Sequence, residues 1–135
     1  MNSFEIKYNG QLITEAKHLE SGQIIRTDAP KGNQGKGEYF SPTDLVCVSL
    51  TSCMLTIIAI STKKYDVNLR GVSAIVTKKM QSSPRMISNI NIVLNFKENY
   101  ESKIKTIIRR TALNCPVYRS LSSKINKKVE FKYPN

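Results

Sequence analysis

Residues 41–60, with the sequence SPTDLVCVSLTSCMLTIIAI, constrain the fold of this chain more than any other stretch. Ser41 can cap a helix with its hydroxyl, and Asp44 stands three residues after it, as in a capping box. Pro42 suits the first helical turn because the N–H that it lacks would have no partner there. The sequence therefore predicts a helix of about 20 residues, roughly 30 Å long.

The predicted helix has apolar residues on every side and no continuous polar face. A helix of this kind has to be buried on most sides, so we expect it to be the central helix of the fold. Polar residues interrupt the run at Thr43, Asp44, Ser49, Thr51, Ser52, Thr56, Ser61 and Thr62. A membrane span needs about 20 predominantly apolar residues, and we therefore expect no membrane association.

The length of 135 residues predicts one domain, residues 1–135. Residues 1–7 hold neither the apolar segment nor the cleavage site of a secretory signal, so a cytoplasmic location with reduced cysteines is expected. Three cysteines without a C-x-x-C motif, together with the single histidine His18, predict neither a metal site nor a disulfide scaffold. The glycines at 32, 35 and 37 do not have the spacing of a phosphate-binding loop, and no cofactor is expected.

The net charge of +11 raises the question of a nucleic-acid partner. The lysines are dispersed over the whole chain, and no aromatic platform with flanking basic residues accompanies them. We interpret the charge as a solvated, lysine-rich surface and expect no nucleic-acid binding. A polyanion-binding face is kept as an alternative.

The other predicted elements surround the central helix. In chain order they are a hairpin at 3–17 turning at Asn9–Gly10, strands at 23–27, 69–79 and 86–96, helices at 100–113 and from 116 to about 123, and a strand at 129–133. Residues 28–39 are expected to form a loop. This order predicts an α+β fold in which sheet wraps the central helix.

The cysteines are the candidates for chemistry. Cys115 precedes Pro116 at the start of a predicted helix, where backbone N–H groups and the helix dipole stabilise a thiolate, so we expect an acidic thiol. Cys53 lies in mid-helix and would need a cation from elsewhere. Cys47 lies about 240° round the helix from Cys53, which prevents these two from pairing. The alternative for each cysteine is an unreactive, buried apolar side chain.

Three segments, SPTDLVCVSLTSCMLTI, SPRMISNINIVLNF and NCPVYRSL, resemble in order and spacing the family of osmotically inducible protein C and organic hydroperoxide resistance proteins (OsmC/Ohr). The resemblance is strongest at S-P-x-D/E-L followed by a cysteine eleven residues after the proline, which Pro42 and Cys53 satisfy. Thr43 directly after the proline and Asp44 next to it match the OsmC-like branch.

The resemblance implies the OsmC-like fold, in which a long central helix is wrapped by antiparallel sheets in an intertwined homodimer with active sites at the subunit interface. It also implies an enzyme, a thiol-dependent peroxidase, with Cys53 as the peroxidatic and Cys115 as the resolving cysteine. The substrate would be an organic hydroperoxide, and an external dithiol would reduce the disulfide. The apolar residues near Cys53 that favour such a substrate are Leu50, Met54 and Ile57.

Three further residues are candidates for supporting this chemistry. Arg85 lies in the SPRMI segment that matches the family, and Arg26 lies on the strand before the 28–39 loop. The alternative for each arginine is an ordinary surface charge. Asp44 is about 180° round the helix from Cys53, so we expect it to cap the helix and not to contact the sulfur.

Two other function classes fit the same sequence. The first is a non-catalytic, homodimeric protein that binds a small hydrophobic ligand and uses its cysteines as core packing. The second is the polyanion-binding protein, whose affinity would depend steeply on salt.

Overall fold

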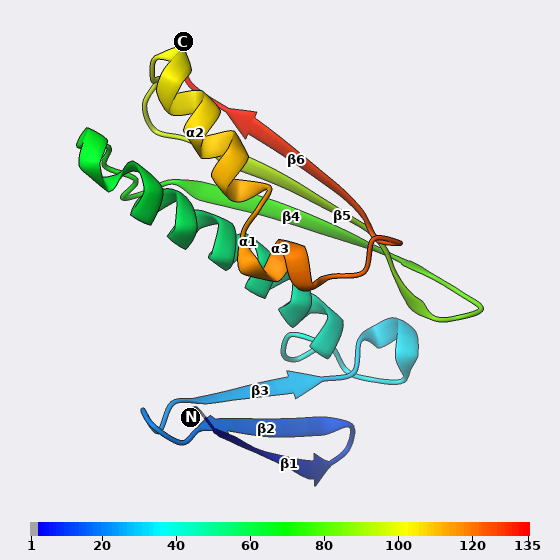
Figure 1. Ribbon diagram of the computed structural model, residues 1–135. Coiled ribbons are helices and arrows are strands. Elements are labelled where there is room, and N and C mark those ends of the chain that lie inside the picture. Colours follow the sequence, from blue (N-terminus) through cyan, green and yellow to red (C-terminus); the bar gives the residue numbers. More distant parts are fainter. Residues whose placement is uncertain (1–2) are drawn as a thin grey trace. The chain divides into compact units, whose positions relative to one another are not determined.

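The computed structural model describes residues 3–135 (Figure 1). Its elements are β1 (Phe4–Gly10), β2 (Ile13–His18), β3 (Ile24–Asp28), η1 (Lys31–Asn33), α1 (Pro42–Thr62), η2 (Lys63–Tyr65), β4 (Ser73–Gln81), β5 (Met86–Asn95), α2 (Ser102–Ala112), α3 (Pro116–Ser120) and β6 (Asn126–Lys132). The predicted α+β class is confirmed. The chain divides into two compact units, Met1–Val46 and Cys47–Asn135, which are described separately. A single domain over residues 1–135 stays a prediction.

The first unit contains an antiparallel sheet with the strand order β1-β2-β3. Side chains alternate between its two faces because the period of a strand is two residues. Phe4, Ile6 and Tyr8 project from one face and are 61%, 62% and 66% exposed. The opposite face carries charged side chains that pair across the strands: Glu5 with Lys17, Lys7 with Glu15, and Glu15 with Arg26.

The predicted hairpin of β1 and β2 is confirmed, but its turn lies later than the sequence indicated. Gly10 pairs with Ile13, so Gln11 and Leu12 form the two-residue loop. Both have positive φ, 56° and 65°, as the tight turns of hairpins with matching twist require. Gly10, with φ of 87°, instead accommodates a register shift after Tyr8. The glycine of the Asn-Gly signal serves this bulge and not the tip of the turn.

The start of α1 has the predicted capping box. Ser41 Oγ accepts a hydrogen bond from the Asp44 N–H at 3.1 Å, and the Ser41 N–H donates to Asp44 Oδ2 at 2.9 Å. These bonds satisfy two backbone donors that a helix start leaves unpaired. The expectation that Asp44 caps the helix is therefore confirmed.

Helix α1 together with η2 is long and apolar enough to cross a membrane, judged by length and composition alone. The polar residues that interrupt the run are therefore weaker grounds against a membrane span than the sequence suggested. The central helix of a water-soluble protein has the same length and composition, so this finding is weak support for a membrane span.

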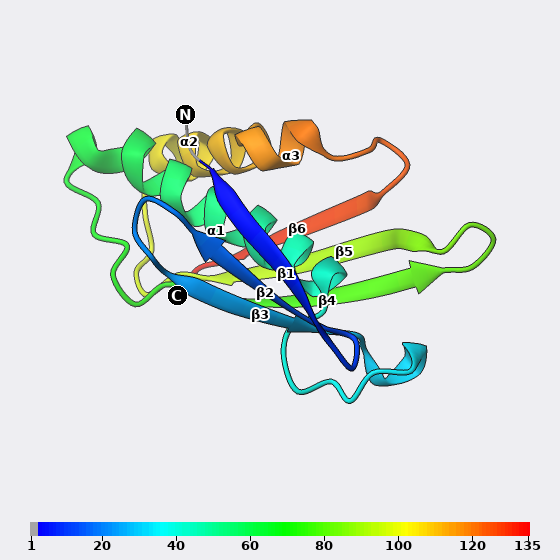
Figure 2. The same ribbon diagram turned by 90° about the horizontal axis from the view of Figure 1, so that it is seen from below.

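The second unit contains a sheet with the strand order β4-β5-β6. The strands β4 and β5 are antiparallel, but β5 and β6 are parallel, which differs from the antiparallel sheets expected. The reason is that α2 and α3 carry the chain back to the end of the sheet where β5 began. Both ribbon views show α2, α3 and the part of α1 in this unit on one face of the sheet (Figures 1 and 2). The large, fully buried apolar side chains between these layers are Leu50, Met54, Ile58, Ile90, Ile92, Leu94 and Ile108.

Candidate active site

Cys53 and Cys115 come together in the second unit. Cys53 lies midway along α1 and is partly exposed, whereas Cys115 is the N-cap residue of α3 and is 0% exposed. The two thiols are neighbours, because the Cys53 thiol is one of the groups that raise the pKa of Cys115. The structure therefore places one partly exposed cysteine next to one buried cysteine, and both are free thiols.

Burial raises the pKa of the Cys115 thiol above its ordinary value, and this effect is the largest. The Tyr118 N–H, which donates to Cys115 Sγ at 3.4 Å, lowers the pKa, while the neighbouring Cys53 thiol raises it further. The prediction of an acidic Cys115 is therefore wrong. A helix of five residues supplies few N–H groups and a small dipole, and these do not compensate for the removal of the sulfur from water.

The backbone around Cys115 is held on both sides. Its N–H donates to the carbonyl of Ala112 at the end of α2, at 3.4 Å, and its carbonyl accepts from the Arg119 N–H at 3.0 Å. Pro116 follows at the first position of α3, where its missing N–H costs nothing. The predicted start of a helix after Cys115 is thus confirmed, and it fixes the direction of the thiol.

The neighbours of Cys53 on α1 need a correction. Leu50 and Met54 are 0% exposed, so they belong to the core and cannot line a substrate site. Ile57 is partly exposed. Cys47 is buried as well, and its carbonyl accepts a hydrogen bond from Thr51 Oγ1 at 3.0 Å. The apolar wall that the sequence suggested beside Cys53 is therefore reduced to Ile57.

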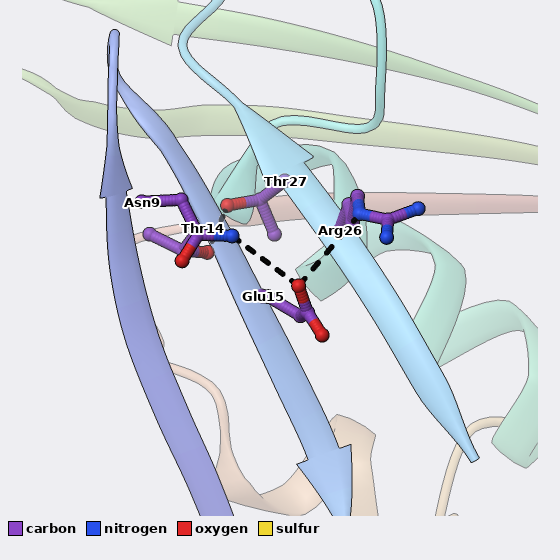
Figure 3. A network of polar contacts seen from close by, with 5 residues as sticks. All are labelled: Asn9, Thr14, Glu15, Arg26 and Thr27. Atoms are coloured by element: carbon purple, nitrogen blue, oxygen red, sulfur yellow. Dashed lines mark hydrogen bonds and ion pairs between the residues drawn. The ribbon is translucent and has the colours of Figure 1, made fainter.

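Arg26 lies on β3 in the first unit, where a carboxylate already holds it. Its Nε lies 3.9 Å from Glu15 Oε2, and the same oxygen accepts a hydrogen bond from Asn9 Nδ2 at 3.2 Å (Figure 3). On the other side of the sheet, Thr14 and Thr27 are hydrogen-bonded to each other. The Arg26 side chain remains 51% exposed, so the ion pair leaves much of the guanidinium accessible.

The first unit also has a cavity of about 520 Å³. Its lining residues are Ile25, Arg26, Glu38, Tyr39, Phe40 and Asp44. Sequence reasoning identified Arg26 and Asp44 but missed the aromatic pair, although two adjacent aromatic residues directly before a helix cap are a visible signal. With an aromatic wall and a guanidinium, the cavity suits a small amphipathic molecule.

Arg85 lies in the turn between β4 and β5, and its side chain is exposed. The end of this hairpin extends past the helices in both ribbon views (Figures 1 and 2). A supporting role of Arg85 at Cys53 stays a prediction. Among residues 3–135, no group of three or more histidine, cysteine, aspartate or glutamate side chains is arranged to hold a metal ion.

Comparisons with known proteins agree with this geometry. The sequence profile of the OsmC-like protein family matches residues 35–130. A Psychrobacter arcticus crystal structure, provisionally named an osmotic stress induced and detoxification response protein, has 45% sequence identity and a TM-score of 0.94, covering 98% of this chain and 96% of that one. A search of curated protein sequences found no match.

Two more distant crystal structures share the fold. The organic hydroperoxide resistance protein OsmC from Legionella pneumophila has 12% identity and a TM-score of 0.77, covering 98% of this chain and 96% of that one. The organic hydroperoxide resistance protein OhrB from Bacillus subtilis has 15% identity and a TM-score of 0.68, covering 98% of both chains. The predicted OsmC-like fold is therefore confirmed.

Proposed function

Because the chain belongs to the OsmC-like family, we propose that it is a thiol-dependent peroxidase that reduces organic hydroperoxides through Cys53 and Cys115. The observation that carries this proposal is the proximity of one partly exposed and one buried cysteine, on two elements far apart in the sequence. A pair of cysteines used only for packing has no need of this asymmetry.

The proposed reaction begins at Cys53, because a peroxide can reach only a sulfur that is accessible. The Cys53 thiolate attacks one peroxide oxygen, the O–O bond breaks, and the leaving alkoxide takes a proton to become an alcohol. Cys53 is thereby oxidised to a sulfenic acid and the hydroperoxide is reduced.

Cys115 would perform the second step. Its sulfur attacks the sulfenic acid of Cys53, a disulfide forms, and the hydroxyl leaves with the Cys115 proton as water. An external dithiol then reduces the disulfide by thiol–disulfide exchange. The third cysteine, Cys47, is buried and does not supply those electrons.

The substrate class rests on different support. The two distant structures that share the fold are named organic hydroperoxide resistance proteins. We also propose a cytoplasmic location, where the cysteines rest as thiols.

The proposed peroxidase predicts a defined product after a single oxidation. One equivalent of cumene hydroperoxide added to the reduced protein should consume two of the three thiols in each chain. Peptide mapping should then find Cys53 and Cys115 joined within one chain, with Cys47 free to be alkylated after denaturation. Cumyl alcohol in place of the peroxide is the control.

The same experiment tests the alternative, a non-catalytic protein that binds a small hydrophobic ligand, which the cavity of the first unit favours. That protein would keep all three thiols after the peroxide is added. A dominant disulfide that contains Cys47 would instead mean that other sulfurs do the chemistry.

We further propose that the working unit is a homodimer. Phe4, Ile6 and Tyr8 form a row of exposed apolar side chains on one face of the first sheet, and such a cluster marks a surface that another protein covers. A second copy of the chain is the partner that a symmetric oligomer supplies.

Replacing Ile6 by aspartate should convert the dimer into a monomer at micromolar concentration, because a charge buried in the interface has no partner there. Sedimentation velocity would measure the change. Lys7→Asp, on the opposite face of the same strand, is the matched control and should leave the dimer intact. A wild-type protein that is monomeric at this concentration would refute the dimer.

A further inference from the structure

Asn114 and Arg119 lie on either side of Cys115 in the sequence, and their side chains are hydrogen-bonded to each other. We call this pair the clamp. Arg119 Nε donates to the backbone carbonyl of Asn114 at 3.2 Å, and Arg119 Nη2 donates to Asn114 Oδ1 at 3.3 Å. Asn114 Nδ2 in turn donates to the carbonyl of Arg110 at 2.7 Å. The clamp therefore ties α3 to the last turn of α2.

The backbone of Cys115 lies between the two residues of the clamp. The Arg119 N–H donates to the Cys115 carbonyl at 3.0 Å, so Arg119 holds both the cysteine backbone and the residue before it. Helix α3 has only five residues and cannot be stable by itself. Its position, and with it the position of the Cys115 sulfur, depends on such contacts.

Lys127 holds the segment that follows the C-terminal end of α3. Lys127 Nζ donates to the carbonyls of Ser122 and Ile125 at 3.3 and 3.2 Å and lies 5.0 Å from the centre of the Tyr118 ring. The clamp holds the other end of α3, the N-terminal end, where Cys115 carries the thiol. Since the clamp bonds the backbone and side chain of Asn114, it acts on geometry and does not touch either sulfur.

We propose that Asn114 and Arg119 are positioning residues that hold Cys115 against Cys53 and thereby set the rate of the resolving step. This inference rests on the proposed function for its role in turnover. In the resolving step the Cys115 sulfur bonds to the sulfenic sulfur of Cys53, and water leaves. A loosened clamp spreads the Cys115 sulfur over more positions and lowers its effective concentration at Cys53, while the attack of Cys53 on peroxide is unaffected.

The first experiment does not depend on peroxide. The reduced protein is equilibrated with mixtures of glutathione disulfide and glutathione, in which one glutathione disulfide oxidises the cysteine pair and releases two glutathione molecules. The fraction of Cys53–Cys115 disulfide gives the effective concentration of the pair. Arg119→Gln should lower it about fivefold, because hydrogen bonds of exposed charged groups are worth little individually.

Two variants make this result specific. Arg110 is a neighbouring exposed arginine that accepts the Asn114 hydrogen bond through its backbone carbonyl and not through its side chain. The effective concentration in Arg110→Gln should therefore stay within twofold of the wild type. Arg119→Lys keeps the charge but cannot make the forked contact, so it should lower the effective concentration as much as Arg119→Gln does. Thermal unfolding of each variant checks that the fold is retained.

The second experiment is a single turnover with cumene hydroperoxide in the absence of other thiols. In Arg119→Gln the oxidation of Cys53 should stay within twofold of the wild type, while disulfide formation slows about fivefold and the sulfenic acid can be trapped with dimedone. The clamp would be overturned if Arg119→Gln or Arg119→Lys had the wild-type effective concentration in the glutathione experiment. It would also be overturned if Arg110→Gln lowered that effective concentration as much as Arg119→Gln does. A chain inert to peroxide that still shows the Arg119→Gln loss with glutathione would overturn only the proposed function.

Discussion

Replacing Cys53 by serine is expected to abolish hydroperoxide turnover, with a fall in kcat/KM on the order of 10³-fold or more. A serine hydroxyl stays protonated at neutral pH and cannot form a sulfenic acid, so the first step has no nucleophile. Cys115 cannot take its place, because it is 0% exposed and burial raises the pKa of its thiol. Consumption of cumene hydroperoxide with dithiothreitol as the reductant measures the loss.

Cys47→Ala is the matched control for this variant. It removes another thiol from the same helix and should keep most of the activity, at a cost in stability of at most a few kcal/mol, which is typical of a small apolar side chain removed from a core. Undiminished steady-state turnover in Cys53→Ser, with the fold intact by circular dichroism, would refute the assignment of Cys53.

The parts of the fold that the sequence predicted well depend on local interactions. The start of α1 is the clearest case, since Ser41 and Asp44 make their reciprocal bonds within one turn of helix. The strand β5 is another, because its alternating apolar residues can have only one buried face. The turn at Gln11 and Leu12 was missed because neither residue favours positive φ, and the register between the two strands decides where the loop falls.

The candidate site was predicted in part, by resemblance and not by spacing. Nothing local links Cys53 on α1 with Cys115 before α3, and only the packed second unit reveals that the two thiols are neighbours. The acidity of Cys115 was mispredicted for the same reason, because a helix start is visible in sequence whereas burial of the sulfur is not. The pairing of Arg26 with Glu15 could have been predicted. The two residues are on neighbouring strands, and the alternation of side chains places both on the charged face of the sheet.

Replacing Cys115 by serine should produce a different failure from that of Cys53→Ser. In the absence of other thiols, the variant should consume one equivalent of cumene hydroperoxide per chain and then stop, because the sulfenic acid of Cys53 has no sulfur to condense with. The first oxidation should stay within a few-fold of the wild type, since only the attacking sulfur takes part in it.

Dimedone labelling followed by mass spectrometry should place the adduct on Cys53 in this variant, whereas in the wild type the adduct should be scarce. Cys115→Ala separates the two contributions of residue 115. Serine keeps a hydroxyl next to Cys53 and alanine does not, so a slower first oxidation in Cys115→Ala alone would measure what a polar neighbour contributes to the attack. Repeated turnover of Cys115→Ser at the wild-type rate, with dithiothreitol present, would show that the external thiol attacks the sulfenic acid directly. In that case the contact between Cys53 and Cys115 would serve the packing of α3 against α1 and not the resolving step.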